Sequence, residues 1–263
     1  MELQDLRYEV ADHVATITLD RPDARNAYSE AMVRSLRVAF RAAEDDPEVR
    51  VVLLTGEGSA FSAGGDLQLM REHSGMFEGS PAELRQRYLD GIHEVPKTIM
   101  GFRKPIVAAI NGPAIGAGLD LACMCDIRVA SSRARFGSTF IQLGLVPGDG
   151  GAYFLARIIG FPRALELILT GRVFDAIEAD RMGLVHEIVE PIFVLPRAKE
   201  FATMIAAHPP EATKLARSLV YESWHLNAAQ SLNLAASYQG IAQNRPEHDA
   251  LVDAMIARTQ KRD

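Results

Sequence analysis

The sequence predicts an α/β protein with an all-helical C-terminal end. Two short and almost wholly apolar runs, residues 49–58 and 106–110, are each followed by a glycine-rich turn and then by a helix-forming segment. An apolar run of this length that ends in glycine is typical of a strand buried on both faces, as in a parallel sheet covered by helices. From residue 152 onward the pattern is mainly helical, so the sheet is expected in the N-terminal part.

The elements of this N-terminal part follow in order along the chain. Residues 8–22 alternate apolar and polar side chains on either side of Ala11 and Asp12, which predicts a hairpin. Residues 29–43 have the apolar spacing of an amphipathic helix, with Ser29 in the place of an N-cap. Two further short strands are expected at residues 126–130 and 135–138, and residues 72–98 are expected to form a polar, mobile loop.

The C-terminal part is predicted to consist of helices with one more strand. Residues 162–171 begin with proline and end with glycine, which suits a helix, and residues 177–189 predict a short helix that leads into a strand. Helices follow over residues 196–258, with breaks at "HPPE" and "NRPEH". We therefore expect an α/β core over residues 1–195 and a helical region over residues 196–263, which forms either a second layer of the core or an oligomerisation element.

Composition excludes several classes of function. The formal net charge is −6 and the basic residues are scattered among acids, which argues against a nucleic-acid partner. No apolar run is long enough to cross a bilayer and no leader is recognisable, so the expectation is a cytoplasmic protein without a membrane partner. Cys123 and Cys125 lack a second ligand pair at metal spacing, so they are expected to be reduced core residues on a strand, and no metal site is predicted.

Other motifs associated with catalysis are absent or broken. Residues 116–121 resemble a dinucleotide-binding fingerprint, but Leu121 stands where the third glycine belongs. The sequence has no phosphate-binding GKS or GKT, no HExxH and no GxSxG. A dinucleotide-dependent oxidoreductase is therefore disfavoured.

Two glycine-rich loops, residues 56–67 and 111–121, each join a predicted buried strand to a helix. Glycine permits positive φ and close approach of a second backbone, and the start of a helix presents unpaired N–H groups. Two such loops that converge could hold one developing oxyanion between two N–H donors. The alternative is that the glycines only make tight connections.

Three aspartates near these loops are candidates for chemistry. Asp66 follows the first glycine loop, where a carboxylate can also simply cap a helix. Asp120 lies one turn into the helix that Ala117 opens, where it either leans over the loop mouth or only complements the helix dipole. Asp149 is flanked by glycines before another helix, and cap and catalytic roles are both open there.

Six motifs in order make the chain resemble the enoyl-CoA hydratase/isomerase, or crotonase, family. They are "DRPDARNAYS", "FSAGGDL", "KPIVAAINGPAIGAGLDLACMCDIRVAS", "ARFGSTFIQLGLVPGDGG", "LTGRVFDAIEADRMGLVHEIV" and "HPPEATKLA". The resemblance implies a crotonase-like spiral of ββα units with a C-terminal helical trimerisation region. It also implies a homotrimer, which often pairs into a homohexamer.

The resemblance also implies a substrate and a set of site residues. The substrate is an acyl group carried as a coenzyme A thioester, with no prosthetic group or metal. The oxyanion-hole N–H groups fall on Gly65 and Ala117. The largely main-chain contacts to coenzyme A fall on Arg25, Ala27, Ala63, Asp66 and Leu67.

The chain departs from the family's hydratases at the acids. The hydratases that resemble this chain carry a glutamate at each of two positions. This sequence has Asp120 at the first position and Phe140 at the second, and Phe140 cannot exchange a proton. Asp149 is the replacement that the sequence offers. One carboxylate suffices to move a proton between two carbons, so isomerase-like chemistry is favoured slightly over hydration by Asp120 with Asp149. The alternative is a catalytically weak family member that binds coenzyme A thioesters without turnover.

Overall fold

The fold contains one long sheet and one short sheet. The computed structural model describes residues 2–260 of the chain. The strands are β1 (Leu6–Ala11), β2 (Val14–Leu19), β3 (Val51–Gly56), β4 (Ile106–Ile110), β5 (Ala114–Ile115), β6 (Ile127–Ser131), β7 (Arg135–Gly137), β8 (Val173–Asp175) and β9 (Glu187–Val189). The long sheet has the order β1-β2-β3-β4-β6-β9 and the short sheet the order β5-β7-β8.

Helices connect and cover these strands. They are α1 (Glu30–Asp45), α2 (Leu67–Glu72), α3 (Pro81–Asp90), α4 (Glu94–Gly101), α5 (Ala117–Met124), α6 (Gly151–Ile159), α7 (Phe161–Thr170), α8 (Ala176–Arg181), α9 (Val194–Ala206), α10 (Pro210–Ser223), α11 (Ala228–Gln243) and α12 (Pro246–Gln260). Short 3-10 turns lie at η1 (Pro22–Ala24), η2 (Gly75–Phe77), η3 (Thr139–Leu143) and η4 (Pro191–Phe193).

The central strands β2, β3, β4 and β6 of the long sheet are largely buried on both faces, as their apolar sequences predict. Only β1 and β2 pair antiparallel, and every other neighbouring pair in this sheet is parallel. Successive residues of a strand point to opposite faces. Val52 and Leu54 accordingly belong to the larger core cluster with α1, α4 and α5, whereas Val51 and Leu53 belong to a smaller cluster with α9.

Several predicted elements are confirmed. Ala11 pairs with Val14 across the first hairpin, where Asp12 takes a positive φ of 52°. The Ser29 side chain caps α1 by accepting a hydrogen bond from the Met32 N–H. The strand predicted at residues 106–110 and the helix that Ala117 opens are both present.

Three expectations are wrong. Residues 72–98 are not a loop, because η2, α3 and most of α4 lie within them. The polar composition of this segment predicts a loop. The start of α3 is nevertheless fixed locally, by a Ser80–Glu83 capping box and by Pro81 at the first helical position. Cys123 lies in α5 and Cys125 at its C-cap, not in a strand, although both are free and buried as expected. The helical end has a third break, at residues 224–227, which carries no proline.

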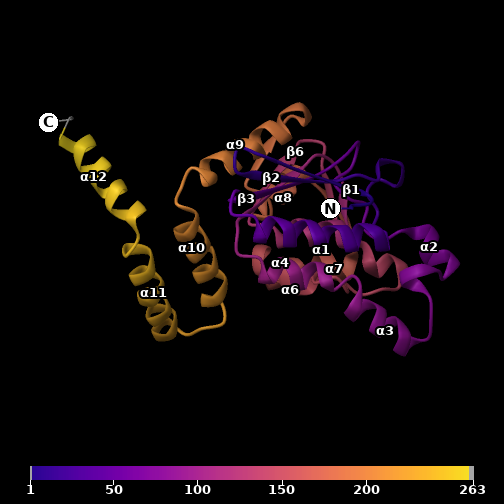
Figure 1. Cartoon of the computed structure of the whole chain (residues 1–263). Coiled ribbons are helices and arrows are strands. Elements are labelled where there is room, and N and C mark those ends of the chain that lie inside the picture. The colour runs from indigo at the N-terminus through magenta and orange to yellow at the C-terminus, as the bar shows by residue number, and fades with distance from the viewer. Residues whose placement is uncertain (1, 261–263) are drawn as a thin grey trace.

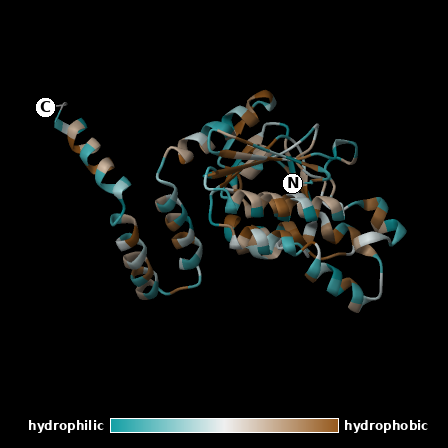
Figure 2. Ribbon diagram, in the orientation of Figure 1, coloured by the Kyte–Doolittle hydropathy of each residue, from teal (hydrophilic) through white to brown (hydrophobic). Residues whose placement is uncertain are grey.

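Helices α10, α11 and α12 extend away from the body of the molecule (Figure 1) and contain no buried residue. Asp126 anchors α10 by accepting hydrogen bonds from the Tyr221 hydroxyl at 2.6 Å and the Arg217 guanidinium at 2.8 Å. Apolar positions recur along these exposed helices (Figure 2). In the described part of the chain, no helix combines the length and the apolarity that crossing a membrane requires.

Candidate active site

The two glycine-rich loops lie side by side. The N–H groups of Phe61 and Ser62 both donate to the Pro113 carbonyl at 3.1 Å, and the Ile115 N–H donates to the Ser62 carbonyl at 3.0 Å. The first loop joins β3 to α2 and the second joins β4 to α5. The structure therefore brings together the two loops that the sequence singled out.

Glycine is required where the loops touch. Gly64 has a φ of +83°, and a Cβ there would lie 2.4 Å from the Ile115 carbonyl oxygen and 3.1 Å from the Ala117 nitrogen. A Cβ on Gly118 would lie 2.3 Å from the Ser62 carbonyl oxygen. No side chain fits at either position without separating the loops.

Two N–H groups are left free at this junction. Within residues 2–260, neither the Gly65 N–H nor the Ala117 N–H has a hydrogen-bond acceptor. Ala117 is the first residue of α5, where the helix supplies no acceptor, and it is almost wholly buried. Two unpaired donors on adjoining loops are the arrangement that an oxyanion needs.

The surroundings of these donors are largely apolar. A Cβ on Gly65 would lie 2.3 Å from the Met70 methyl group of α2 and 3.8 Å from the Phe77 ring of η2. On the second loop, the Phe140 ring would lie 3.7 Å from a Cβ on Gly116. Apolar walls lower the local dielectric constant and so strengthen an electrostatic contact made between them.

Asp120 is fully buried behind the second loop. Its Oδ2 accepts a hydrogen bond from the Gly151 N–H at 3.0 Å, and its Oδ1 has no partner among the described residues. Burial, and then the charge of Asp149, raise the pKa of Asp120 well above its ordinary value, although the Gly151 N–H opposes the shift. Burial therefore favours the protonated form of Asp120.

Asp149 lies in the same buried region and is 6% exposed. No cation pairs with it in the described chain, and its Oδ1 has no hydrogen-bond partner there. Burial raises the pKa of Asp149 to about 7. A carboxyl group with this pKa can both take and release a proton near neutral pH.

Tyr28 lies near the acids, and sequence reasoning did not select it. Its N–H donates to the Gly64 carbonyl at 2.7 Å, its side chain is buried, and its hydroxyl makes no hydrogen bond within residues 2–260. Burial first, and then the charges of Asp149 and Asp120, raise the pKa of Tyr28 well above its ordinary value. The only sign of Tyr28 in the sequence was its place directly after "RNA", a motif that was considered only for its main-chain contacts to coenzyme A.

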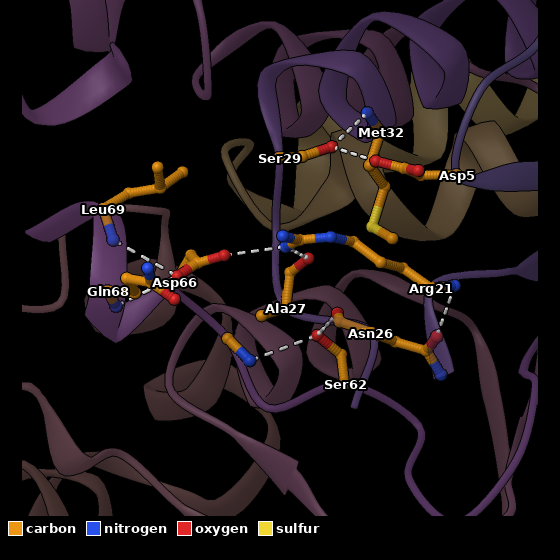
Figure 3. A network of polar contacts seen from close by, with 11 residues as sticks. Asp5, Arg21, Asn26, Ala27, Ser29, Met32, Ser62, Asp66, Gln68 and Leu69 are labelled. Atoms are coloured by element: carbon orange, nitrogen blue, oxygen red, sulfur yellow. Dashed lines mark hydrogen bonds and ion pairs between the residues drawn. The ribbon is translucent and has the colours of Figure 1, made fainter. Parts of the chain in front are cut away.

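The residues to which the family resemblance assigns coenzyme A contacts lie on two adjacent segments. The Ala63 N–H donates to the Arg25 carbonyl at 2.9 Å. Asp66 caps α2 and accepts a hydrogen bond from Arg21 at 2.8 Å, and Arg21 also donates to the Ala27 carbonyl (Figure 3). Leu67 is exposed beside them.

Arg21 therefore connects the two segments, a role that the sequence did not reveal. Burial raises the pKa of Asp66, but the hydrogen bonds from Arg21, Leu69 and Gln68 together lower it below its ordinary value. Asp66 is therefore an anionic helix cap, which is the simpler of the two roles that the sequence left open.

Nothing in the described chain forms a metal centre. No group of three or more His, Cys, Asp or Glu side chains in residues 2–260 is placed to hold a metal ion. The thiols of Cys123 and Cys125 are buried, and burial raises the pKa of both above the ordinary value.

Comparison with known proteins shows the family and the fold. The family model for enoyl-CoA hydratase/isomerase matches residues 9–257. The chain belongs to the enoyl-CoA hydratase/isomerase family. Its architecture is the crotonase fold, as the resemblance predicted.

Individual relatives of this family member are similar over nearly their whole length. The short-chain-enoyl-CoA hydratase of Clostridium acetobutylicum is 35% identical over 263 residues, which cover 100% of this chain and 97% of that protein. The crotonyl-CoA hydratase of Syntrophomonas wolfei is 33% identical over 92% of this chain and 90% of its own. The crystal structure of an enoyl-CoA hydratase from Bacillus anthracis is 30% identical, covers 97% of both chains and has a TM-score of 0.90.

Proposed function

We propose that this enoyl-CoA hydratase/isomerase family protein binds an enoyl-CoA and stabilises the enolate of its thioester. The thioester oxygen would accept hydrogen bonds from the N–H groups of Gly65 and Ala117, which have no acceptor within the described chain. The oxygen gains negative charge when a proton leaves the neighbouring carbon, so these bonds strengthen as the reaction proceeds. Loss of one such donor costs about a hundredfold or more in rate in comparable sites.

The reaction that we favour is movement of the double bond, with Asp149 as the group that carries the proton. Asp149 takes a proton from C2 of a 3-enoyl thioester, the electron pair spreads to the thioester oxygen, and the proton returns to C4. The observation that carries this proposal is the buried carboxyl group of Asp149, without a cationic partner in the described chain and with a pKa of about 7. Phe140 can supply no second acid.

Hydration of a 2-enoyl-CoA is the second candidate. Two relatives are named as hydratases, and Asp120 lies close enough for the charge of Asp149 to raise its pKa. In this candidate the two aspartates together orient the water and exchange its proton. A third possibility is binding of the thioester without turnover.

The coenzyme A part of the substrate is proposed to lie along the two segments that Arg21 connects. Main-chain groups of Arg25, Ala27, Ala63, Asp66 and Leu67 would contact it. The Arg25 side chain is exposed, so we propose that it affects coenzyme A only through its positive charge. We expect Arg25→Glu to raise KM more than it lowers kcat, through repulsion of the coenzyme A phosphates.

The decisive experiment offers paired 2-enoyl-CoA and 3-enoyl-CoA substrates of several chain lengths to the purified protein. Products are followed by mass and by absorbance of the conjugated thioester. A shift of the double bond without a change of mass supports isomerisation, and gain of one water supports hydration. Binding of acyl-CoA without any product would leave the non-catalytic possibility.

Aspartate variants then assign the acid. We expect Asp149→Asn to lower turnover by about 10²- to 10⁴-fold, and Asp45→Asn, an exposed control, to have no effect. Full activity in Asp149→Asn together with loss in Asp120→Asn would transfer the role to Asp120.

A further inference from the structure

The segment from η2 to the start of α4 contacts both halves of the proposed site. At one end, the Phe77 ring lies beside Gly65, one of the two proposed oxyanion donors. At the other end, His93 reaches the loop that carries Asp149. The two contacts are 16 residues apart, with α3 between them.

The Asp149 loop has little to orient it by itself. Residues 144–150 contain no helix or strand, and Asp149 makes no side-chain ion pair or hydrogen bond within residues 2–260. Gly150 follows with a φ of 105° as the N-cap of α6. The direction of the Asp149 carboxylate is therefore set by how the backbone beside it is held.

His93 and Tyr88 hold that backbone at the residue before Asp149. The Nε2 of His93 lies 2.7 Å from the Gly148 carbonyl oxygen, so this nitrogen carries the proton and donates it. The Tyr88 ring closes the other side, because a Cβ on Gly148 would lie 3.1 Å from its Cε1. The two rings also pack edge to face, with centroids 5.7 Å apart.

We propose that His93 is a positioning residue that directs the Asp149 carboxylate toward the substrate by holding the Gly148 carbonyl. This inference rests on the proposed function, in which Asp149 exchanges a proton with the acyl chain. Without the His93 donor, the loop loses its only side-chain hydrogen bond from the described chain at Gly148. The carboxylate is then free to turn toward water.

Loss of the His93 donor is expected to change kcat and not KM. The proposed coenzyme A contacts lie on residues 25–27 and 63–67, and His93 makes no hydrogen bond to either segment. Misplacement of a catalytic group can lower the rate by up to about a hundredfold. We expect His93→Phe, which keeps a ring but removes the donor, to lower kcat about 10- to 50-fold with KM changed less than about twofold.

Two further variants separate positioning from general stability. His93→Gln retains an N–H donor and is expected to recover most of kcat. Lys97→Met removes a hydrogen bond of 2.7 Å from the Lys97 ammonium to the Leu89 carbonyl in the same segment, without touching Gly148. It is expected to leave kcat unchanged, even if the melting temperature falls as it does in His93→Phe.

A double variant tests whether His93 acts through Asp149. In an Asp149→Asn background with measurable residual turnover, His93→Phe should cause no further loss. A further loss as large as in the wild type would overturn the inference, and so would an unchanged kcat in His93→Phe of an active enzyme.

The last measurement needs no turnover. Carboxyl ¹³C resonances are recorded against pH, with Asp149 assigned by its loss in Asp149→Asn. His93→Phe is expected to lower the pKa of Asp149 from about 7 toward its ordinary value, because the freed carboxylate gains water. Asp120, Tyr28 and Tyr88, whose titration the Asp149 charge influences, all stay in place. An unchanged titration would overturn the inference, whereas absence of turnover in the wild type would overturn only the proposed function.

Discussion

At the residue scale, the two buried aspartates differ in how their carboxyl groups are held. Asp120 sits on a helix and receives the Gly151 N–H, whereas Asp149 sits on a loop and receives no hydrogen bond from a described residue at its Oδ1. The pKa of Asp120 lies well above its ordinary value, and the pKa of Asp149 is about 7. The pKa of Asp149 is therefore suited to proton exchange near neutral pH.

This difference predicts a pH dependence of activity. Asp149 must be ionised to take a proton from carbon, so kcat/KM is expected to rise as pH increases through about 7 and then to level off. Steady-state rates between about pH 5 and 9 test this. A rising limb centred near the ordinary aspartate pKa would show that Asp149 is not the base.

The same raised pKa predicts an effect on stability. Between the unfolded pKa of about 4 and the folded pKa of about 7, the native state binds the proton more tightly, so ionisation costs stability as pH rises through this window. Three pKa units correspond to at most about 4 kcal/mol. We expect Asp149→Asn to gain in free energy of unfolding relative to the wild type between pH 4 and 8, by up to about that amount, in urea titrations. A difference that stays constant with pH would contradict it.

Ala117 allows a proposed donor to be removed cleanly. Ala117 is the first residue of α5, a position at which proline is well tolerated, and its N–H has no acceptor in residues 2–260. Ala117→Pro is expected to lower kcat about a hundredfold or more with little change in melting temperature. Ala117→Ser keeps the N–H and is the matched control; equal loss in both would point to crowding of the site.

At the element scale, the junction of the two loops depends on α5 approaching the first loop closely. Gly118 makes this approach possible, since a Cβ there would meet the Ser62 carbonyl oxygen at 2.3 Å. The sequence predicted both loops from glycine spacing. It could not predict that they touch, because their contact joins segments about 50 residues apart through backbone hydrogen bonds that any residue type can make.

Alanine substitutions test this junction. Gly118→Ala is expected to lower the free energy of unfolding by about 2 kcal/mol or more and to reduce turnover, because the clash is with backbone. Gly240→Ala, in α11 with open space around its Cβ position, should instead raise it by up to about 1 kcal/mol. Equal stability of the two variants in chemical denaturation would contradict the close approach.

At the scale of the whole molecule, the C-terminal helices α10 to α12 leave their apolar side chains uncovered within the described chain. Helices α10 to α12 bury no residue, yet Leu232, Leu251 and Met255 are each more than half exposed. Helix α9, by contrast, packs against the sheet through Val194, Ala198 and Ala202. The boundary at residues 195 and 196 stays a prediction, as does the oligomerisation role of the region beyond it.

We expect the protein to form a homotrimer, or a hexamer of two trimers, through these helices. Light scattering should give a mass of three or six times 28.8 kDa. Leu251→Glu with Met255→Glu should reduce this mass, because charges are costly in an apolar interface. Gln243→Glu, exposed on α11, is the control and should leave the mass unchanged. A monomeric wild-type chain would contradict the proposed role.

The sequence by itself determined the fold class, the positions of most strands and helices, the two glycine loops and the family. The fold class, the elements and the loops follow from local signals: apolar periodicity, caps and the conformational freedom of glycine. The family follows from the resemblance of six ordered motifs. Only the tertiary structure decided that Asp149, Asp120 and Tyr28 share one buried region and that His93 reaches the Asp149 loop. Burial and contact between distant segments depend on how the whole chain packs, and the same packing raises the pKa of Asp149 to about 7.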